Sequence, residues 1–594
     1  MIYCIFMSTE SKLPSIVPLH PGAVPIALCL SRVAGIRELV EEFTSWAPTD
    51  DCLSPGILVE TLTAALLCGC RPLYKIEIFW QENRFVEQFY KDDGITAEQL
   101  NDDAYGRLLD RLSRIDLQCL LEICCIRMLQ YHGLEIVLTH SDTTSISVEG
   151  VYLIGDDETF NQSSPVDGQS SPIEEPPAED PFTITHGFSK DHNPHKKQFK
   201  VGISVQQNGL LISGDILPGN DSDQIWTPQA VEELSRMLKE KGYDNVIHLA
   251  DAAVISTKSL SIFVQHDIPF ISRFPETFNL AEELKIDAWN ADNWENLGVL
   301  AETEKKAARY KTWEAEREIE GDTFGFIVVH SSKLEERKEK KLQTKVETEK
   351  KRLQNQSKKL LKKPYACEAD AMRDGHLLQE IAEEQGFYTE LEVNMVEKCK
   401  HSRKGRPKKG EEPTKEISWH AEVKIGSIKP EVYEQRKRLA STFVLIHRLK
   451  EKKTSKEILM SYKNQDKVEQ GFKFIKQPQY LGPVYTKIPS RVKALGYIFL
   501  FVLLLGKYLE YRVRIGMQQS GGKLIIGGQN VKNPSARTII EILNKMLIYA
   551  INGEMKLPDH INQNVLNVIH WAGFNEDVYI HGYTGDRFIG VKGG

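Results

Sequence analysis

Apolar residues recur every three or four positions through roughly the first 132 residues, which is the spacing of one helix face. Four segments carry the pattern: "LVEEFTSWA", "GILVETLTAALLCG", "AYGRLLDRLSRI" and "LLEICCIRMLQYH". Pro and Gly residues separate the earlier segments, as expected where helices end. The pattern predicts a helical N-terminal domain over residues 1–132.

The pattern changes at Gly133, after which β-branched and alternating residues predict strands. The segment "LEIVLTHSDTTSISVEG" is expected to form a pair of strands. Residues 199–207 and 210–218 predict two further strands, and Asn208-Gly209 between them is a typical two-residue hairpin turn. These strands are therefore expected to be antiparallel neighbours in one sheet.

Helices and strands then alternate along the chain. A helix from near Pro228 to Gly242 is followed by the buried strand "NVIHLAD" (245–251), a second helix and the strand "PFISRF". Antiparallel strands followed by alternating helices and strands predict a mixed sheet flanked by helices. This order resembles that of the ribonuclease-H-like fold, so we expect an α/β protein with such a core.

Residues 276–453 have a different composition and are expected to form an inserted α/β region. Within them, residues 333–363 form a helical run with 13 Lys or Arg against 5 acidic residues. This run is either a solvated helix face or a surface that follows a phosphate backbone. A capping box at Thr454 and Glu457 then predicts the start of a helix that ends before Pro478. We assign residues 133–275 and 454–490 to the core, and 491–594 to a helical C-terminal region.

Composition and charge restrict the class of protein. The chain of 594 residues is 41% apolar and 27% charged, typical of soluble proteins, and its formal net charge of −8 excludes a molecule that is basic overall. Its ten cysteines form no CxxC pair and no cluster with zinc-ligand spacing. The N-terminus lacks the features of a signal peptide, and the apolar run 494–506 is shorter than the ~18–20 residues that span a bilayer. We expect a cytoplasmic protein without membrane contact, in which this run is a buried core helix.

Three acidic residues are candidates for chemistry. Asp142 lies where an apolar strand meets polar residues, Asp251 ends the strand "NVIHLAD", and Glu469 lies on the helix that follows the insertion. Buried carboxylates are costly unless they are paired or bind a metal. Three acids from two strands and a helix can hold two Mg²⁺ ions for phosphoryl transfer. The alternative is three unrelated surface acids.

The segment "YKNQDKVEQGFKFIK" (462–476) places four polar side chains on one line if it is a continuous helix. At about 100° per residue, Tyr462, Gln465, Glu469 and Lys476 fall within roughly 60° of each other. An ammonium can hold a phosphate as a point charge, a tyrosine hydroxyl can hydrogen-bond one, and an amide can donate without charge. The alternative is a helix whose polar face meets solvent.

The spacing Tyr-x2-Gln-x3-Glu-x6-Lys resembles the Y-R-E-K signature of DDE insertion-sequence transposases, the insertion-sequence-four superfamily. Tyr462, Glu469 and Lys476 match, whereas Gln465 stands where the family usually has Arg. "HSDTTS" and "HLADAAV" are similar to the family's first and second aspartate motifs. "HGFSKDHNPHKKQ" (186–198) is similar to a segment between them. The four patches occur in the family's order.

The resemblance implies a metal-dependent transposase and endonuclease of a mobile element. Asp142, Asp251 and Glu469 would be its catalytic acids and would bind two Mg²⁺ or Mn²⁺ ions. The enzyme would bind terminal inverted repeats, cleave phosphodiesters and join the 3′-hydroxyl ends to target DNA, which is cut-and-paste DNA transposition, a form of DNA recombination. Its partner would be double-stranded DNA, its assembly a homodimer in a synaptic complex, and its location the prokaryotic cytoplasm at the nucleoid. The domain over 1–132 is then a candidate for binding terminal DNA or a second subunit.

Further basic residues are candidates for DNA binding. Lys190 and His192 lie in the patch between the two aspartates. The segment "HSRKGRPKKG" (401–410), with Arg403, Arg406 and Lys408, resembles an AT-hook, whose arginine enters a narrow A·T minor groove. The alternative for this segment is a solvated basic loop.

Two other functions remain compatible with the sequence. One is a ribonuclease-H-like metal-dependent nuclease or resolvase, which cleaves DNA without joining strands. The other is an inactive remnant of a transposase that still binds DNA, a possibility raised by Gln465 in place of the family's Arg.

Overall fold

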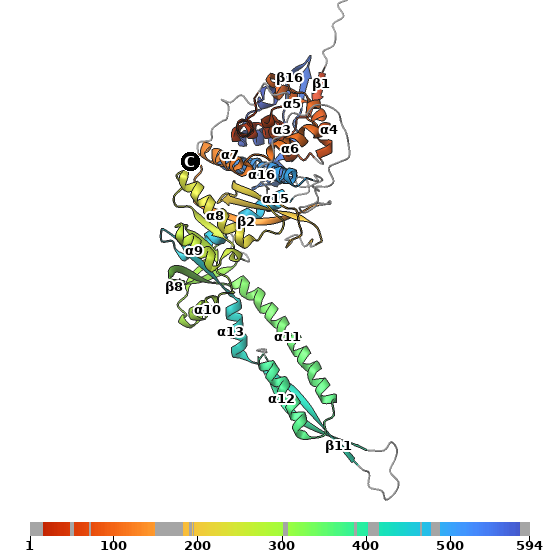
Figure 1. Cartoon of the computed structure of the whole chain (residues 1–594), viewed down its shortest axis with the longest axis vertical. Helices are drawn as coiled ribbons and strands as arrows, with labels where there is room; N and C mark the ends of the chain where they lie inside the picture. The colour runs from red at the N-terminus through yellow and green to blue at the C-terminus, as the bar shows by residue number, and fades with distance from the viewer. Residues whose placement is uncertain are drawn as a thin grey trace, which may run out of the picture. The chain divides into compact units, whose positions relative to one another are not determined.

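The structure is a computed structural model whose contacts form two compact units (Figure 1), residues 1–270 with 461–594, and residues 271–460. The sequence predicted an insertion over 276–453, and the second unit occupies this part of the chain. The residues that the structure describes are 16–47, 53–70, 73–148, 182–188, 193, 195–300, 307–384, 389–401, 415–463, 466–476 and 488–582.

The N-terminal part of the first unit is built mainly of helices, as the apolar spacing predicts. They are α1 (Val24–Ala34), α2 (Ile36–Phe43), α3 (Pro55–Leu67), α4 (Ile76–Glu82), α5 (Phe85–Phe89), α6 (Asp102–Leu112) and α7 (Leu117–Tyr131). Side-chain caps begin three of them, since Ser54, Asn101 and Asp116 each accept a hydrogen bond from a backbone N–H three residues later. This part also holds the strand β1 (Ile16–Leu19), which the helical pattern did not predict.

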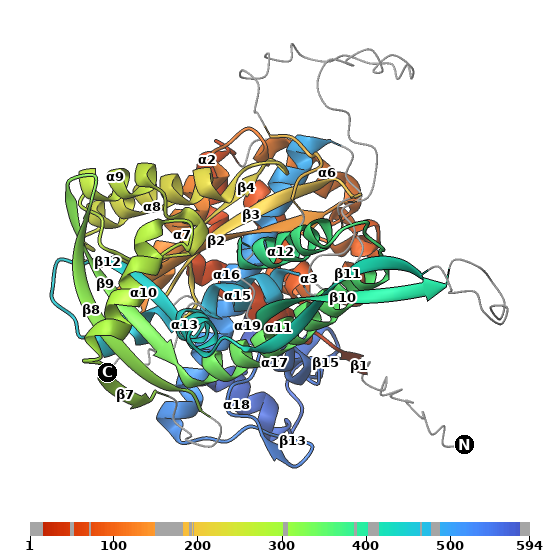
Figure 2. The ribbon, with the colours of Figure 1, turned by 90° about the horizontal axis from the view of Figure 1, so that it is seen from below.

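The sheet of the first unit has the strand order β4-β3-β2-β5. Its strands are β2 (Leu138–Ser147), β3 (Gln198–Gln206), β4 (Leu211–Leu217) and β5 (Ile247–Ala250). β2 pairs antiparallel with β3 and β3 with β4, whereas β2 and β5 are parallel. Figure 2 shows β2, β3 and β4 side by side. The predicted hairpin is confirmed, but its loop is longer than the predicted two-residue turn: Gln206 N donates to Leu210 O, which leaves residues 207–209 as the loop, with Gly209 at a φ of 82°.

The expectation of two strands in "LEIVLTHSDTTSISVEG" is wrong. The structure has the single strand β2 there, and it pairs with β3 over nine consecutive residues. The polar stretch within the segment contains Thr143 and Thr144, whose β-branched side chains favour extended backbone. Polarity in this stretch therefore marks a site within a strand, and not the end of one.

Helices cover both faces of this sheet. On one face, α8 (Asp223–Glu240) sets Trp226 against Gly202, where an added Cβ would lie 2.3 Å from the indole ring. On the other face, α16 (Pro489–Ser520) sets Leu500 against Gly214 and Gly496 against Ile216. The two glycine contacts with α16 let the helix approach the strands closely. α8 begins at Asp223, earlier than predicted, because Ser222 caps it and Pro228 is accommodated inside.

α16 is the central helix of the first unit. Its length and composition would allow it to cross a membrane, but 94% of its most apolar 18-residue window is buried inside the protein. Its apolar residues share one core with the N-terminal helices, the sheet and the C-terminal helices. The buried core helix predicted over 494–506 is therefore confirmed, within a longer helix.

The C-terminal part is not helical throughout. It holds α17 (Ala536–Leu543), α18 (Gln563–Trp571), α19 (Val578–His581), β13 (Ile525–Ile526), β14 (Gln529–Asn530), β15 (Ile548–Ile551) and β16 (Glu554–Lys556). The predicted helical C-terminal region includes residues 544–551, but α17 ends at Leu543. β15 is a strand because it pairs with β1, which lies more than 500 residues away in the chain.

The second unit has its own strands in the order β6-β12-β9-β8-β7. They are β6 (Phe270–Arg273), β12 (Thr442–Arg448), β9 (Asp322–Ser331), β8 (Arg309–Ile319) and β7 (Glu295–Val299). The helices are α10 (Asn279–Ala291), α11 (Ser332–Lys362), α12 (Glu368–Glu384) and α13 (Pro430–Ala440). A hairpin of β10 (Thr389–His401) and β11 (Lys415–Ile428) packs on α11 and α12 through Leu353, Leu378 and Val423. The predicted charged helix over 333–363 is α11.

A buried charge network joins α16 to α17. Glu510, whose side chain is 6% exposed, accepts hydrogen bonds from Lys507 Nζ at 3.0 Å and from the backbone N–H of Ala536 at 2.8 Å. Arg514 lies 3.4 Å from the same carboxylate. Removing one member of a buried charged pair leaves the other charge without compensation, which is strongly destabilising.

We therefore expect Glu510→Gln to lower the free energy of unfolding by about 3 kcal/mol, measured by chemical denaturation. The matched control is Glu541→Gln, which breaks the exposed Glu541–Arg537 pair and should cost less than about 1 kcal/mol. Equal effects of the two substitutions would contradict a structural role for the Glu510 network.

Candidate active site

The parallel pairing of β2 with β5 sets the geometry of the candidate site. Leu138, Thr139 and His140 lie opposite Ile247, His248 and Leu249. The Thr139 hydroxyl and His248 Nδ1 are 2.8 Å apart and both residues are buried. Burial lowers the pKa of His248 to about 3, so the imidazole is neutral near pH 7. This histidine serves as a hydrogen-bonding residue between the strands.

The same register brings Asp142 and Asp251 together. Each lies two residues beyond His140 and Leu249, the last pair of the parallel ladder, and Asp251 keeps an extended backbone with φ −76° and ψ 156°. Continuing the register places the two aspartates on neighbouring strands with their side chains on one face of the sheet. Asp142 is half-buried and Asp251 is exposed.

Both aspartates have the same local anchor. Asp142 Oδ1 accepts a hydrogen bond from the N–H of Thr143, and Asp251 Oδ1 accepts one from the N–H of Ala252, each at 2.7 Å. Such a bond fixes the orientation of each carboxylate. The two carboxylates are thus held in a matched way at one edge of the site.

α15 (Asp466–Ile475), which carries Glu469, lies on the same face of the sheet. Asp142 is paired with Ile203 across β2 and β3, so these two side chains point to one face. A Cβ added at Gly471 would lie 2.9 Å from Ile203 Cδ1, so α15 approaches the sheet at Ile203. Val468 and Phe472 are buried on either side of Glu469 and hold the helix down.

A second contact anchors α15 to α16. The Phe474 ring lies against Gly506, where an added Cβ would be 2.4 Å from Phe474 Cζ. Lys507 Nζ lies 5.5 Å from the centre of the same ring, a cation–π contact. α15 is therefore positioned by the sheet at Gly471 and by the central helix at Phe474.

Glu469 faces outward from this helix. Its side chain is 67% exposed, and Lys473 Nζ lies 3.9 Å from Glu469 Oε2, one turn later. Such an exposed pair contributes at most about 0.5 kcal/mol, so the carboxylate can leave it readily. Within the described ranges, no group of three or more His, Cys, Asp or Glu side chains is close enough to hold one metal ion. The two aspartates follow the paired residues of β2 and β5, and Glu469 lies on the covering helix.

Of the segment 462–476, the structure describes the end of α14 (Ser455–Lys463) and then α15 (Asp466–Ile475) with Lys476, and residues 464 and 465 lie outside the described residues. The single line of polar residues therefore stays a prediction. Tyr462 is on α14 and Lys476 lies just beyond α15, and both are half-buried. The predicted capping box is confirmed, since Thr454 N donates to Glu457 Oε2 at 2.8 Å and Glu457 N donates to Thr454 Oγ1 at 3.3 Å.

The remaining predicted DNA contacts lie outside the described residues: Gln465, Lys190, His192, Arg403, Arg406 and Lys408. Conversely, sequence reasoning did not identify His248, Gly471 or Gly506 as residues that position the site. The sequence does contain a feature that points to Gly471. A glycine inside an amphipathic helix costs about 1 kcal/mol relative to Ala, so its presence there indicates a close packing contact. Gly506 gave the same signal within the apolar run.

The fold and site define a mixed α/β protein with two neighbouring carboxylates on parallel strands and a third acid on a covering helix. Residues 26–125 match a family model described as a domain of unknown function (DUF4277), which covers α1 to most of α7. No curated protein matches the chain.

Among solved structures, the chain is similar to the piggyBac transposase in a synaptic complex with hairpin DNA. The identity is 8%, the match covers 88% of this chain and 79% of that one, and the TM-score is 0.37. It is also similar to the Mos1 transposase in a paired-end complex with the left transposon end, with 15% identity, coverage of 34% and 60%, and a TM-score of 0.14. A Mos1 mariner paired-end complex with Mn has 12% identity, coverage of 41% and 76%, and a TM-score of 0.14. These similarities are weak, so a function must come from the chain's own residues.

The contact between α15 and α16 can be tested by filling it. Gly506→Ala would place a methyl group against Phe474 and Leu67, and such overpacking costs about 1–3 kcal/mol. We expect faster amide hydrogen exchange in α15, measured by mass spectrometry, because the helix loses its second anchor.

Gly106→Ala is the matched control, since the nearest atom to its added Cβ is 3.7 Å away, on Arg491. It should be neutral or stabilise α6 by up to about 1 kcal/mol. Unchanged exchange in α15 of the Gly506→Ala protein would show that this contact does not position Glu469.

Proposed function

We propose that this chain is a DDE-type DNA transposase with Asp142, Asp251 and Glu469 as its catalytic acids. The observation that carries the proposal is the parallel register of β2 and β5, because continuing it by two residues would set the two aspartates side by side on the sheet face that α15 covers. Two sequence motifs that are 109 residues apart would then lie close together in space, which is not expected of unrelated surface acids.

The strand order supports a ribonuclease-H-like core. Three antiparallel strands, β4, β3 and β2, are followed by β5 parallel to β2, and helices lie on both faces. In an α/β sheet, side chains at the carboxyl ends of neighbouring parallel strands form a common site. Asp251 directly follows β5, and Asp142 lies at the matching level of β2.

The donor set fits hard divalent cations. Carboxylate oxygens are the ligands that Mg²⁺ and Mn²⁺ prefer, and Asp142 and Asp251 each supply a carboxylate that a backbone N–H orients. Glu469 would join them by exchanging its weak contact with Lys473 for the metal. Two such ions, when bound, would activate the attacking hydroxyl and stabilise the leaving oxygen.

The chain's own residues would bind and orient the DNA. Lys476 and Tyr462 flank α15 and are proposed to contact phosphates, together with Gln465. In this function the protein binds terminal inverted repeats as a homodimer, cleaves the DNA and joins the 3′-hydroxyl ends to target DNA. It would act in the prokaryotic cytoplasm at the nucleoid. Because the sheet and α15 are fixed before DNA arrives, positioning and charge neutralisation would supply most of the catalysis.

We expect Asp142→Asn, Asp251→Asn and Glu469→Gln each to lower cleavage by at least about a hundredfold, which corresponds to ~2.7 kcal/mol of activation free energy. The substrate is a duplex carrying the inverted repeats that flank the coding sequence, incubated with Mg²⁺ or Mn²⁺. EDTA should abolish cleavage by the unsubstituted protein.

Asp244→Asn is the control, because Asp244 is exposed and lies in the turn before β5. Full cleavage by the Asp142→Asn protein would refute the proposed site. Cleavage without strand joining would identify a nuclease or resolvase, and DNA binding without any cleavage would identify an inactive remnant.

Gln465→Arg should strengthen binding to transposon ends. A guanidinium adds charge-assisted, bidentate hydrogen bonds to a phosphate, and a bond to a charged group contributes ~1.5–3 kcal/mol, or about tenfold or more in affinity. Electrophoretic mobility shifts with end duplexes measure the effect. Gln563→Arg adds the same charge at the exposed start of α18 and should change affinity little. An equal gain from both substitutions would show a general charge effect and no phosphate contact at Gln465.

A further inference from the structure

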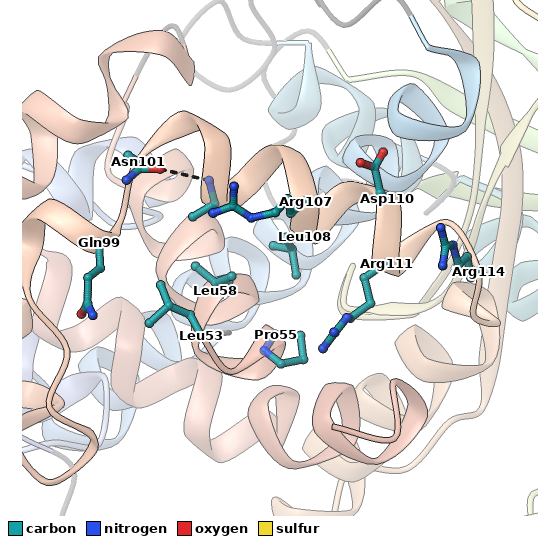
Figure 3. Close-up of a pocket in the computed structure, with 11 residues that line it drawn as sticks. Leu53, Pro55, Leu58, Gln99, Asn101, Arg107, Leu108, Asp110, Arg111 and Arg114 are labelled. Atoms are coloured by element: carbon teal, nitrogen blue, oxygen red, sulfur yellow. Dashed lines mark hydrogen bonds between the residues drawn. The ribbon is translucent and has the colours of Figure 1, made fainter. Parts of the chain in front are cut away.

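A groove of about 800 Å³ lies among the N-terminal helices of the first unit, away from the strand residues of the candidate active site (Figure 3). It is lined from the start of α3, the segment before α6, and α6 itself. Leu58 and Leu108 are buried beneath it, with exposures of 5% and 2%, and give it a packed floor. The groove is therefore built on a rigid part of the fold.

Three arginines, Arg107, Arg111 and Arg114, line this groove (Figure 3). Their spacing of four and three residues places them on one side of α6 and its immediate continuation. At 1.5 Å per residue they extend over about 10.5 Å, which is the axial length of roughly three base pairs of duplex DNA. Arg107 and Arg114 are exposed, and Arg111 is half-buried.

The charge of the arginines is not compensated inside the groove. Asp110 is the acidic residue of the lining, and it is engaged by Arg491 of α16, with Arg491 Nη2 at 2.6 Å from Asp110 Oδ2. Within the part of the chain that the structure describes, none of the three arginines forms an ion pair with a carboxylate. A protein with a net charge of −8 thus keeps a local row of three positive charges.

The same helix connects the groove to α15. Arg491 lies near the start of α16 and holds α6 through Asp110, whereas Lys507, 16 residues later, contacts Phe474 of α15. Sixteen residues of helix measure about 24 Å, close to the axial length of seven base pairs. One duplex is therefore long enough to reach both the arginine row and the helix that carries Glu469.

We propose that the groove binds the sugar-phosphate backbone of a DNA duplex through Arg107, Arg111 and Arg114. A row of guanidinium groups matches a regular row of phosphates, each of which it can contact with bidentate hydrogen bonds. These contacts position the duplex and carry no base specificity. The site extends the proposed transposase function, on which it rests, by assigning a DNA-positioning surface to the region that matches the domain of unknown function.

The test is the salt dependence of DNA binding. Fluorescence anisotropy of a labelled mixed-sequence duplex, with the full chain in EDTA, measures binding without cleavage. The triple substitution Arg107→Gln, Arg111→Gln and Arg114→Gln should reduce the slope of log K against log salt by about 3, because each phosphate contact contributes roughly 0.9. Replacing the same three arginines by Lys keeps the charge and should keep most of the slope.

The matched control removes three arginines elsewhere: Arg236→Gln, Arg373→Gln and Arg537→Gln. Each is exposed and pairs with a carboxylate on its own helix. This control should leave the slope unchanged, and far-ultraviolet circular dichroism should show that both triple variants are folded.

An unchanged slope in the groove variant would overturn the proposed surface. So would loss of dimerisation with unchanged DNA affinity, measured by sedimentation, which would make the groove a subunit contact. If the groove variant loses the slope but the unsubstituted chain never cleaves DNA, the groove stands and the transposase proposal fails. If the unsubstituted chain binds no DNA, both proposals fail.

Discussion

The candidate site depends on the parallel register of β2 and β5, and a buried hydrogen bond between Thr139 and His248 joins the two strands in this register. Side chains alternate between the two faces of a strand, so a slip of one residue would move Asp251 to the face away from Asp142 and α15. The buried, neutral imidazole favours the observed register, because any other pairing would leave its nitrogen without this partner. The position of the two carboxylates is thus a consequence of packing several residues before them.

α16 connects the sheet to other helices of the first unit. It packs on the sheet at Gly214, holds α15 through Phe474, and reaches α6 through Arg491. A single helix of 32 residues therefore connects the strands, the helix bearing Glu469 and the helix bearing the arginine row. Lys507 and Glu510 are paired with each other, and Glu510 also accepts a hydrogen bond from the start of α17, which explains how so apolar a helix tolerates these two buried charges.

The two kinds of acid in the site have different surroundings. Asp142 and Asp251 are oriented by backbone N–H groups, whereas Glu469 is exposed and forms a weak pair with Lys473. In the proposed function, the two aspartates would be preorganised, and Glu469 would move into place when metal and DNA bind. In this view the protein supplies a rigid floor, and α15 supplies the final ligand.

The sequence by itself determined the local features. Apolar spacing predicted the N-terminal helices, turn residues predicted the β3–β4 hairpin, and motif spacing singled out Asp142, Asp251 and Glu469. Tertiary structure decided what local patterns cannot encode. β15 is a strand because β1 pairs with it, and "HSDTTS" stays in one strand because β3 pairs along it. The arginine row is a candidate DNA-binding surface because, in the folded protein, Arg491 of α16 engages Asp110. These outcomes depend on partners far away in the chain, and short-range periodicity carries no information about such partners.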